Sequence, residues 1–169
     1  MSVPERVRLA VEALEIAPGD RVLEFGCGPG VSVELVCARL GPGGFVAAVD
    51  RSATAVARTL SRVSACVEAG RAAVCQTAFT AAGLAGCGLA ATPYDKIFSI
   101  NVNLYWTGAA EAELALARSL LAPGGRLYAF YEAPGGRTPE ISARVADTFR
   151  AGGFAPTVTT DGVLCVSGI

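Results

Sequence analysis

The sequence predicts an α/β fold in which helices cover both faces of a mostly parallel β-sheet. Short apolar segments of strand length alternate with helical segments along nearly the whole chain, a pattern typical of βαβ units with right-handed crossovers. An Asp-Gly pair near the C-terminus, between two strand-like segments, predicts a tight hairpin that adds an antiparallel strand. No repeat, low-complexity tract or polar linker divides the 169 residues, so we expect one domain over residues 1–169.

The expected helices begin and end at recognisable signals. Ser52 can cap one helix, and Thr138 can cap another that has Pro139 at its first position. The Ala-Pro-Gly-Gly run at 122–125 should stop a helix, whereas the alanine- and glycine-rich residues 79–92 hold either a short helix or a loop. Strands are expected over residues 21–25, 45–50, 73–77, 96–101, 126–131, 155–160 and 163–168, and helices over about 7–16, 31–40, 52–69, 108–121 and 138–151.

Composition restricts the chemistry that the chain can carry. The sequence has no histidine, which excludes a Ser-His-Asp triad, a Cys-His pair, a His-held zinc ion and a histidine general base. Its 14 basic and 15 acidic residues form no basic stripe, so no nucleic-acid partner is expected. No apolar stretch reaches the roughly 18 residues of a membrane span and no apolar leader is visible, so we expect a cytoplasmic protein with no membrane partner.

The cysteines are expected to be reduced, and mostly small buried hydrophobic residues. No two of them have the C-x-x-C spacing of zinc and redox sites, and cytoplasmic proteins keep their thiols reduced. We therefore expect no metal site. The six cysteines are Cys27, Cys37, Cys66, Cys75, Cys87 and Cys165.

A glycine-rich loop follows the first expected strand and precedes a helix. Such a loop lets a ligand approach the backbone and exposes the N–H groups at the start of the helix. The dinucleotide fingerprint G-x-G-x-x-G does not fit, because Val31 stands at its last position while the glycines are Gly26, Gly28 and Gly30. This spacing disfavours a nicotinamide dinucleotide.

Two acidic residues accompany the loop. Glu24, two residues before the first glycine, would repel a pyrophosphate and favour a cationic group. Asp50, at the end of the second strand, is suited to accept hydrogen bonds from two ribose hydroxyls. An acid for an amino group and an acid for a ribose together indicate a site for S-adenosylmethionine.

With these motifs the sequence resembles the class I S-adenosylmethionine-dependent methyltransferases, and specifically the small methyltransferase-domain proteins. The likeness implies a Rossmann-like, doubly wound sheet of seven strands, mostly parallel, with an antiparallel C-terminal hairpin strand. It rests on residues 22–30, 48–52, 94–102 with the aromatic pair Tyr105 and Trp106, and 121–125.

The resemblance also implies roles for single residues. Glu24 would help to hold the methionine amino group, the backbone of Gly26, Cys27 and Gly28 would pass close to the cofactor, and Asp50 would bind the ribose. Relatives often carry an aspartate after the third strand for the adenine amino group, but Gln76-Thr77-Ala78 stands there, so Thr77 or backbone carbonyls would have to substitute. The cofactor contacts expected besides these come from Arg51 or Ser52 along the adenine, from Ala78 and from Asn101.

The methyl acceptor is expected to be a small molecule. Segment 100–103 lacks the Asn/Asp-Pro-Pro-Tyr signature of base-amino methyltransferases, and neither a Pro-Cys nucleophile nor an acidic pair for magnesium is found. Methyl transfer is an in-line displacement that mainly needs a nucleophile held about 3 Å away. An amine, thiol or carboxylate can react without a base, whereas a hydroxyl needs one. The candidate catalytic residues are Asn101, Tyr105, Tyr131 and Glu132, of which only the last two could act as that base.

Substrate contacts are expected from the polar and aromatic segment 102–107. Asn103, Tyr105 and Trp106 would wall the acceptor pocket, although the aromatic residues could equally pack beneath a polar loop. The first helix, a partner subunit or the loop at 132–137 could close the pocket, and the oligomeric state is left open. The alternatives to a methyltransferase are a noncatalytic subunit that binds S-adenosylmethionine beside a partner enzyme, and a short NAD-dependent dehydrogenase.

Overall fold

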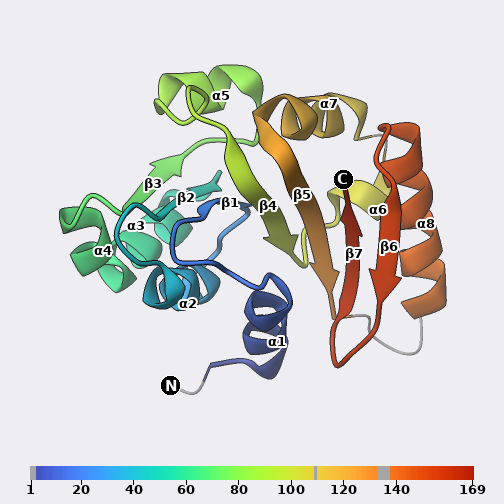
Figure 1. Ribbon diagram of the computed structural model, residues 1–169, viewed down its shortest axis with the longest axis horizontal. Coiled ribbons are helices and arrows are strands. Elements are labelled where there is room, and N and C mark those ends of the chain that lie inside the picture. The colour runs from blue at the N-terminus through green and yellow to red at the C-terminus, as the bar shows by residue number, and fades with distance from the viewer. Residues whose placement is uncertain (1–2, 109, 133–137) are drawn as a thin grey trace.

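The computed structural model describes residues 3–108, 110–132 and 138–169, and within them one seven-stranded sheet has the order β3-β2-β1-β4-β5-β7-β6 (Figure 1). Strand β7 is antiparallel to both of its neighbours, and the other strand pairs are parallel. This confirms the α/β class and the antiparallel C-terminal strand. The strands are β1 (Arg21–Phe25), β2 (Phe45–Asp50), β3 (Ala72–Gln76), β4 (Tyr94–Ile100), β5 (Leu121–Tyr131), β6 (Pro156–Thr159) and β7 (Leu164–Gly168).

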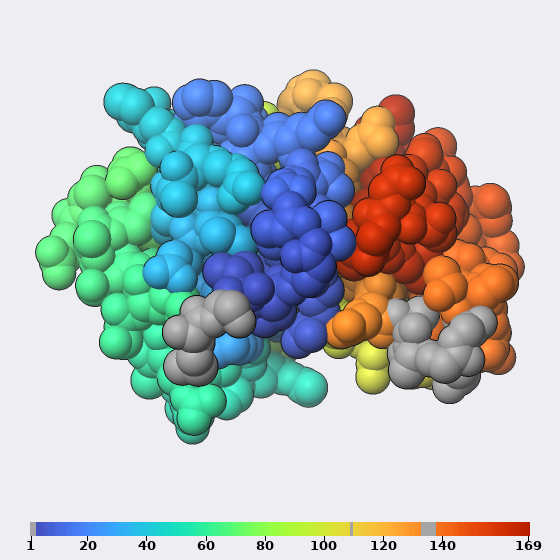
Figure 2. All heavy atoms as spheres, turned by 90° about the horizontal axis from the view of Figure 1, so that it is seen from below, coloured from blue at the N-terminus to red at the C-terminus, as the bar shows by residue number. Residues whose placement is uncertain are grey.

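Helices cover both faces of the sheet and bury two separate apolar clusters. One face carries α1 (Glu5–Ala13), α2 (Val31–Arg39), α3 (Ala53–Arg62) and α4 (Ser64–Glu68). The other carries α5 (Ala81–Gly86), α6 (Leu104–Thr107), α7 (Glu111–Leu120) and α8 (Thr138–Ala151). Figure 2 shows α1, in dark blue, between α2, in lighter blue, and the C-terminal hairpin, in red. No helix in the described ranges is long and apolar enough to span a membrane.

The register of the parallel strands brings three loops together. Phe25 is paired with Val49, and Asp50 is paired with Gln76. The glycine loop, the end of β2 and the segment that begins at Thr77 therefore follow one another along one edge of the sheet. Ligands bind at this carboxyl edge in open α/β sheets.

Several elements differ from the sequence-based expectation. The helix expected over 52–69 is broken at Val63 into α3 and α4, and segment 102–107 contains the short helix α6. Residues 122–125 belong to β5 instead of lying outside it, beside a register shift in β4. A Cβ atom at Gly125 would lie 2.9 Å from the carbonyl oxygen of Tyr94, so a glycine allows this close approach.

The expectation that every cysteine is reduced is wrong for one pair. Cys75 at the end of β3 and Cys87 after α5 form a disulfide, with their Cα atoms 6.3 Å apart. The spacing of 12 residues gave no local signal, because α5 must first fold back onto β3 to bring the two together. Cys27, Cys66 and Cys165 are free and buried, as expected, and Cys37 is free and half-buried.

Candidate functional site

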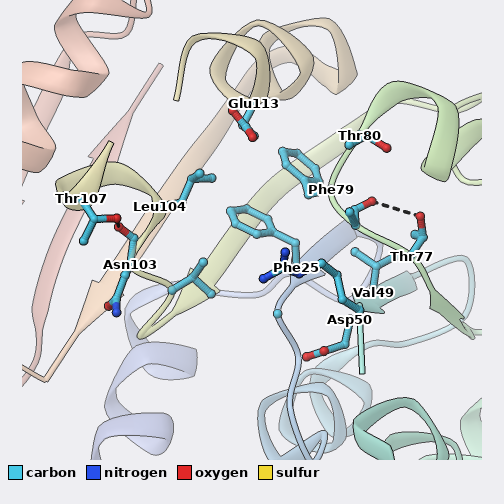
Figure 3. Close-up of a pocket in the computed structure, with 14 residues that line it drawn as sticks. Phe25, Val49, Asp50, Thr77, Phe79, Thr80, Asn103, Leu104, Thr107 and Glu113 are labelled. Atoms are coloured by element: carbon cyan, nitrogen blue, oxygen red, sulfur yellow. Dashed lines mark hydrogen bonds between the residues drawn. The ribbon is translucent and has the colours of Figure 1, made fainter. Parts of the chain in front are cut away.

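A cavity of about 530 Å³ opens at the carboxyl ends of β1 to β4. It has the size of an ordinary small-molecule site. Figure 3 shows side chains from both sides of the sheet edge converging on it. The residues that line it are Phe25, Gly26, Val49, Asp50, Arg51, Thr77, Ala78, Phe79, Thr80, Val102, Asn103, Leu104, Thr107 and Glu113.

The three glycines of the loop serve different purposes. All three have positive φ, between 53° and 77°. A Cβ atom at Gly26 would lie 2.7 Å from Cγ2 of Val102, and one at Gly30 would lie 2.7 Å from Cγ2 of Thr59. No atom comes within 4 Å of the same position at Gly28. The outer two glycines thus permit close packing, and Gly28 leaves open space beside the backbone.

Two residues of α3 anchor this loop, and the sequence analysis missed them. The buried hydroxyl of Thr59 donates to the carbonyl oxygen of Gly28 at 2.9 Å, and Nε of Arg62 donates to the carbonyl oxygen of Pro29 at 3.0 Å. The two side chains lie one helical turn apart, so they reach the same stretch of loop. No motif marks them, because the contact depends on how α3 packs against the loop.

The Asp50 carboxylate is held in a fixed orientation at the cavity wall. Its Oδ2 accepts from the backbone N–H of Gly28 and its Oδ1 from the backbone N–H of Ser52, both at 2.9 Å. A carboxylate has about four lone-pair positions, so each oxygen retains one for a ligand. The arrangement suits a pair of neighbouring hydroxyl donors such as a ribose diol.

Glu24 lies beneath the loop and outside the residues that line the cavity. It is 1% exposed, and both of its carboxyl oxygens lie 2.7 Å from the hydroxyl of Ser32 in α2. Burial raises the pKa of Glu24 to about 8; the Ser32 hydroxyl opposes the rise and the nearby charge of Asp50 adds to it. The carboxyl group is therefore largely protonated at neutral pH. Its contact with a methionine amino group stays a prediction.

Cys27, also named as a cofactor contact, turns its side chain into the protein. Its sulfur lies 3.7 Å from the hydroxyl oxygen of Thr59. Burial raises the pKa of the Cys27 thiol to about 12, and the nearby carboxyl group of Glu24 adds to the rise. Cys27 is thus an unreactive thiol, and only its backbone remains a candidate for ligand contact.

The segment after β3 contributes Thr77 and Ala78 to the cavity, as expected, together with Thr80. Thr77 donates its hydroxyl to the carbonyl oxygen of Ala78 at 3.2 Å, and the hydroxyl of Thr80 accepts from the N–H of Gly83 at 3.1 Å, which caps α5. A Cβ atom at Gly83 would lie 2.1 Å from the Thr77 hydroxyl. The segment is therefore packed tightly onto α5.

Asn101 joins the ends of two strands instead of lining the cavity. Its backbone N–H donates to the carbonyl oxygen of Phe130, and its side-chain oxygen accepts from the N–H of Glu132, both at 2.8 Å. Its φ of 55° is a left-handed conformation that asparagine tolerates. The structure therefore places Asn101 as a bridge between β4 and β5.

Tyr105 does not reach the main cavity, which agrees with the alternative that the aromatic residues pack beneath the loop. Tyr105 is fully buried, with its ring packed edge-on against Phe25 and Phe149. Trp106 lies in a shallow groove beside α8 and donates its indole N–H to the side-chain oxygen of Asn103 at 3.3 Å. Of the three predicted substrate contacts, only Asn103 lines the main cavity.

The two candidate bases are also held by other contacts. Tyr131 is buried and donates its hydroxyl to the carbonyl oxygen of Val102 at 3.0 Å, and burial raises its pKa well above that of an ordinary phenol. Glu132 is exposed and forms an ion pair with Arg6 of α1 at 3.0 Å. Neither residue lines the cavity. The pair with Arg6 ties α1 to the end of β5, while residues 133–137, named as a possible cover, lie outside the described residues.

Sequence reasoning missed most of the apolar lining and one acid. Phe25 and Phe79 stack with ring centroids 4.4 Å apart, and Leu104 lies across the cavity from Thr77 in Figure 3. Glu113 enters from the first turn of α7. In the sequence it is an ordinary acid at the start of a helix, and only the placement of α7 over the cavity distinguishes it.

Comparison with known proteins agrees with this geometry. The profile of the family described as "Methyltransferase domain" matches residues 22–125, more than half of the chain. The chain belongs to this methyltransferase family. S-adenosylmethionine is the cofactor of such enzymes, which confirms the cofactor expected from the glycine loop and its acids.

Two curated relatives of this methyltransferase domain are named for different methyl acceptors. The chain is 31% identical over 126 residues to trans-aconitate 2-methyltransferase of Paracidovorax citrulli (strain AAC00-1), covering 73% of this chain and 44% of the relative. It is 34% identical over 161 residues to protein-L-isoaspartate O-methyltransferase of Methylorubrum extorquens (strain PA1), covering 92% of this chain and 61% of the relative. The chain thus spans about half the length of these relatives.

Solved structures share the fold of the domain. A SAM-dependent methyltransferase from Aquifex aeolicus superimposes with a TM-score of 0.72 at 17% identity, covering 96% of this chain and 87% of that one. At this identity the likeness establishes the fold alone.

Proposed function

We propose that this protein transfers a methyl group from S-adenosylmethionine to a small-molecule acceptor by in-line displacement, without a histidine base or a metal ion. The observation that carries the proposal is the Asp50 carboxylate. It is fixed by the N–H groups of Gly28 and Ser52 at the wall of a cavity that the glycine loop leaves open. A carboxylate held in this way is preorganised for two ribose hydroxyls.

The residues present fit the cofactor. Asp50 would hold the ribose, and the backbone from Gly26 to Gly28 would lie along the methionine portion, beside the space that Gly28 leaves free. Thr77, Ala78 and Arg51 line the same cavity and would flank the adenine. Glu24 is buried beneath the loop and would act toward the amino group as a neutral hydrogen-bond acceptor, not as a charge. When bound, S-adenosylmethionine supplies a methyl group that its positive sulfur has already activated.

The chain's own contribution is to position the acceptor and exclude water. Val102, Asn103, Leu104 and Thr107 form the side of the cavity nearest the end of β4. Because Tyr131 remains a protonated phenol and Glu132 lies outside the cavity, neither is placed to deprotonate an alcohol. With these two candidate bases set aside, we propose as acceptor a neutral amine, a thiol or a carboxylate, which reacts through proximity and desolvation.

The size of the cavity and the net charge of the chain support the proposal of a small-molecule acceptor. The cavity of about 530 Å³ suits a small ligand beside the cofactor, and a net charge of -1 offers no attraction to a phosphate backbone. The two relatives are named for different acceptors, one for a small metabolite and one for a protein residue, so membership of the family does not fix the acceptor.

A second function is favoured by one observation. None of the four candidate catalytic residues lines the cavity. Asn101, Tyr105 and Tyr131 use their side chains for internal contacts, and Glu132 pairs with Arg6. A noncatalytic subunit that binds S-adenosylmethionine and supports a partner enzyme would need only the cofactor half of the site.

Calorimetric titration with S-adenosylhomocysteine tests the cofactor site. We expect micromolar binding by the wild type and at least about a 100-fold loss in Asp50→Ala, because two hydrogen bonds to a charged group are removed. The exposed residue Asp161 gives the matched control Asp161→Ala, which should bind normally. Wild-type protein that binds neither S-adenosylmethionine nor S-adenosylhomocysteine would refute the proposal. Methylation of an amine, thiol or carboxylate acceptor by the purified chain would exclude the noncatalytic alternative.

A further inference from the structure

The cavity contains a second carboxylate, on the side opposite Asp50. Glu113 projects from α7 toward Phe79, and in Figure 3 the rings of Phe25 and Phe79 lie between the two acids. The site therefore has a carboxylate that can accept hydrogen bonds on each of two facing sides, with an aromatic surface between them.

Among the polar side chains of the cavity, only those of Glu113 and the exposed Arg51 make no hydrogen bond in the part of the chain that the structure describes, and Glu113 is the half-buried one of the two. The hydroxyls of Thr77, Thr80 and Thr107 and the side-chain oxygen of Asn103 all make hydrogen bonds within the protein. Glu113 makes no hydrogen bond or ion pair with any residue in 3–108, 110–132 or 138–169. A half-buried carboxylate with no protein donor requires water or a ligand to satisfy it.

An effect on helix stability does not explain where Glu113 lies. Glu111 occupies the same first turn of α7, where either acid is favourable for the helix dipole, but Glu111 is exposed and does not line the cavity. Glu113 instead faces the interior. Burial raises the pKa of Tyr105 well above its ordinary value, and the electrostatic influence of the nearby Tyr131 and Glu113 adds to the rise.

We propose that the Glu113 carboxylate accepts a hydrogen bond from the exocyclic amino group of the cofactor's adenine and so selects adenosine over other nucleosides. This inference rests on the proposed function, because it requires the ribose at Asp50. A purine is flat and apolar on its faces, which suits the surface formed by Phe25, Val49 and Phe79. Its amino group is an N–H donor at the edge of the ring, away from the ribose, and Glu113 is the free acceptor on the side away from Asp50.

The segment after β3 offers no charged acceptor. It carries no acid from Gln76 to Thr80, and the hydroxyls of Thr77 and Thr80, which contact Ala78 and Gly83, can accept only as neutral groups. The Glu113 carboxylate on α7 would instead supply the charged acceptor for the adenine amino group. It would also reject a 6-oxo purine, whose carbonyl oxygen would face the carboxylate oxygens with no proton between them.

The test compares two ligands and two matched variants by calorimetry. The ligands are S-adenosylhomocysteine and its 6-oxo analogue, in which a carbonyl replaces the adenine amino group. We expect wild type to prefer the amino ligand by about 10- to 100-fold, as is usual when a buried polar group loses its partner. Glu113→Gln should bind S-adenosylhomocysteine about 10-fold more weakly and lose most of the preference, because an amide can donate to the carbonyl as well as accept from the amine. Glu111→Gln should retain wild-type affinities, and melting temperatures close to wild type would show that both variants are folded.

Two results would overturn the proposal while leaving the proposed function intact. In the first, Glu113→Gln keeps the wild-type preference for the amino ligand. In the second, both ligands bind the variant as they bind wild type and only the KM for the methyl acceptor rises, which would assign the carboxylate to the acceptor. If the wild type binds neither ligand, the proposed function fails and the adenine contact fails with it.

Discussion

The two sides of the cavity are built in different ways. On the side of β1 and β2, backbone groups of the glycine loop and of the start of α3 hold the Asp50 carboxylate, and α3 in turn holds the loop through Thr59. On the side of α5 to α7, helices of 6 and 4 residues, a disulfide and Glu113 form the wall. We propose that the first side is a preformed frame for the ribose, and that the second side supplies the side chains that contact the adenine and the methyl acceptor.

The first side contains a buried carboxyl group whose effect on stability depends on pH. Glutamate in an unfolded chain has a pKa of about 4.3, and burial raises that of Glu24 to about 8 in the folded protein. The folded state therefore binds more protons between these values, so the contribution of this group to stability is fully present below about pH 4 and is lost as the pH rises towards 8. From pH 5 to pH 8 we expect this group to remove about 4 kcal/mol from the free energy of unfolding.

The isosteric variant Glu24→Gln isolates that effect. Its amide cannot ionise and can still accept from Ser32, so urea unfolding between pH 5 and pH 8 should show a much flatter profile than wild type. Equal slopes for the two proteins would mean that Glu24 is not the group responsible.

The rigid packing of the glycine loop predicts a large effect at Gly30. Alanine there would combine a φ of 77° with a Cβ atom 2.7 Å from Thr59, and we expect a loss of about 3 kcal/mol in the free energy of unfolding. Gly43 has a similar φ of 86° but open space around it, so Gly43→Ala measures the conformational cost alone, about 1 kcal/mol. Similar losses in the two variants would show that the loop is not tightly packed against α3.

The second side should respond to reduction. Cys75 and Cys87 are both half-buried, so a dithiol can reach their disulfide, and opening it frees the segment that carries Thr77 to Thr80. We expect dithiothreitol to lower stability by about 2 kcal/mol and to weaken S-adenosylhomocysteine binding several-fold, because the ligand must then order that segment. The double variant Cys75→Ser/Cys87→Ser should resemble the reduced protein with and without reductant. An unchanged affinity on reduction would mean that the segment is ordered without the disulfide.

The difference between the two sides of the cavity also explains which features the sequence could predict. The alternation of strands and helices, the Asp-Gly hairpin and the Ser52 cap are local signals, and the structure confirms each of them. The glycine loop and Asp50 are equally local, because a strand that ends in glycines and an acid at the next strand's end must meet at the sheet edge.

The other side of the cavity depends on tertiary packing that no short motif encodes. Tyr105 and Tyr131 are of a residue type common in active sites, but both are buried in the core. Phe79 and Glu113 carry no motif in the sequence, but both line the cavity. The Cys75–Cys87 pair forms only because α5 folds back onto β3. A short helix contains too few residues to show in the sequence which of its faces is buried, because tertiary packing sets that orientation.

A crystal structure of the protein with S-adenosylhomocysteine tests this assignment of the two sides most directly. We predict both ribose hydroxyls within about 3 Å of the Asp50 carboxylate oxygens, and the adenine amino group at hydrogen-bonding distance from Glu113. An adenosine bound away from Asp50, or an adenine whose amino group points to solvent or to the segment after β3, would contradict it.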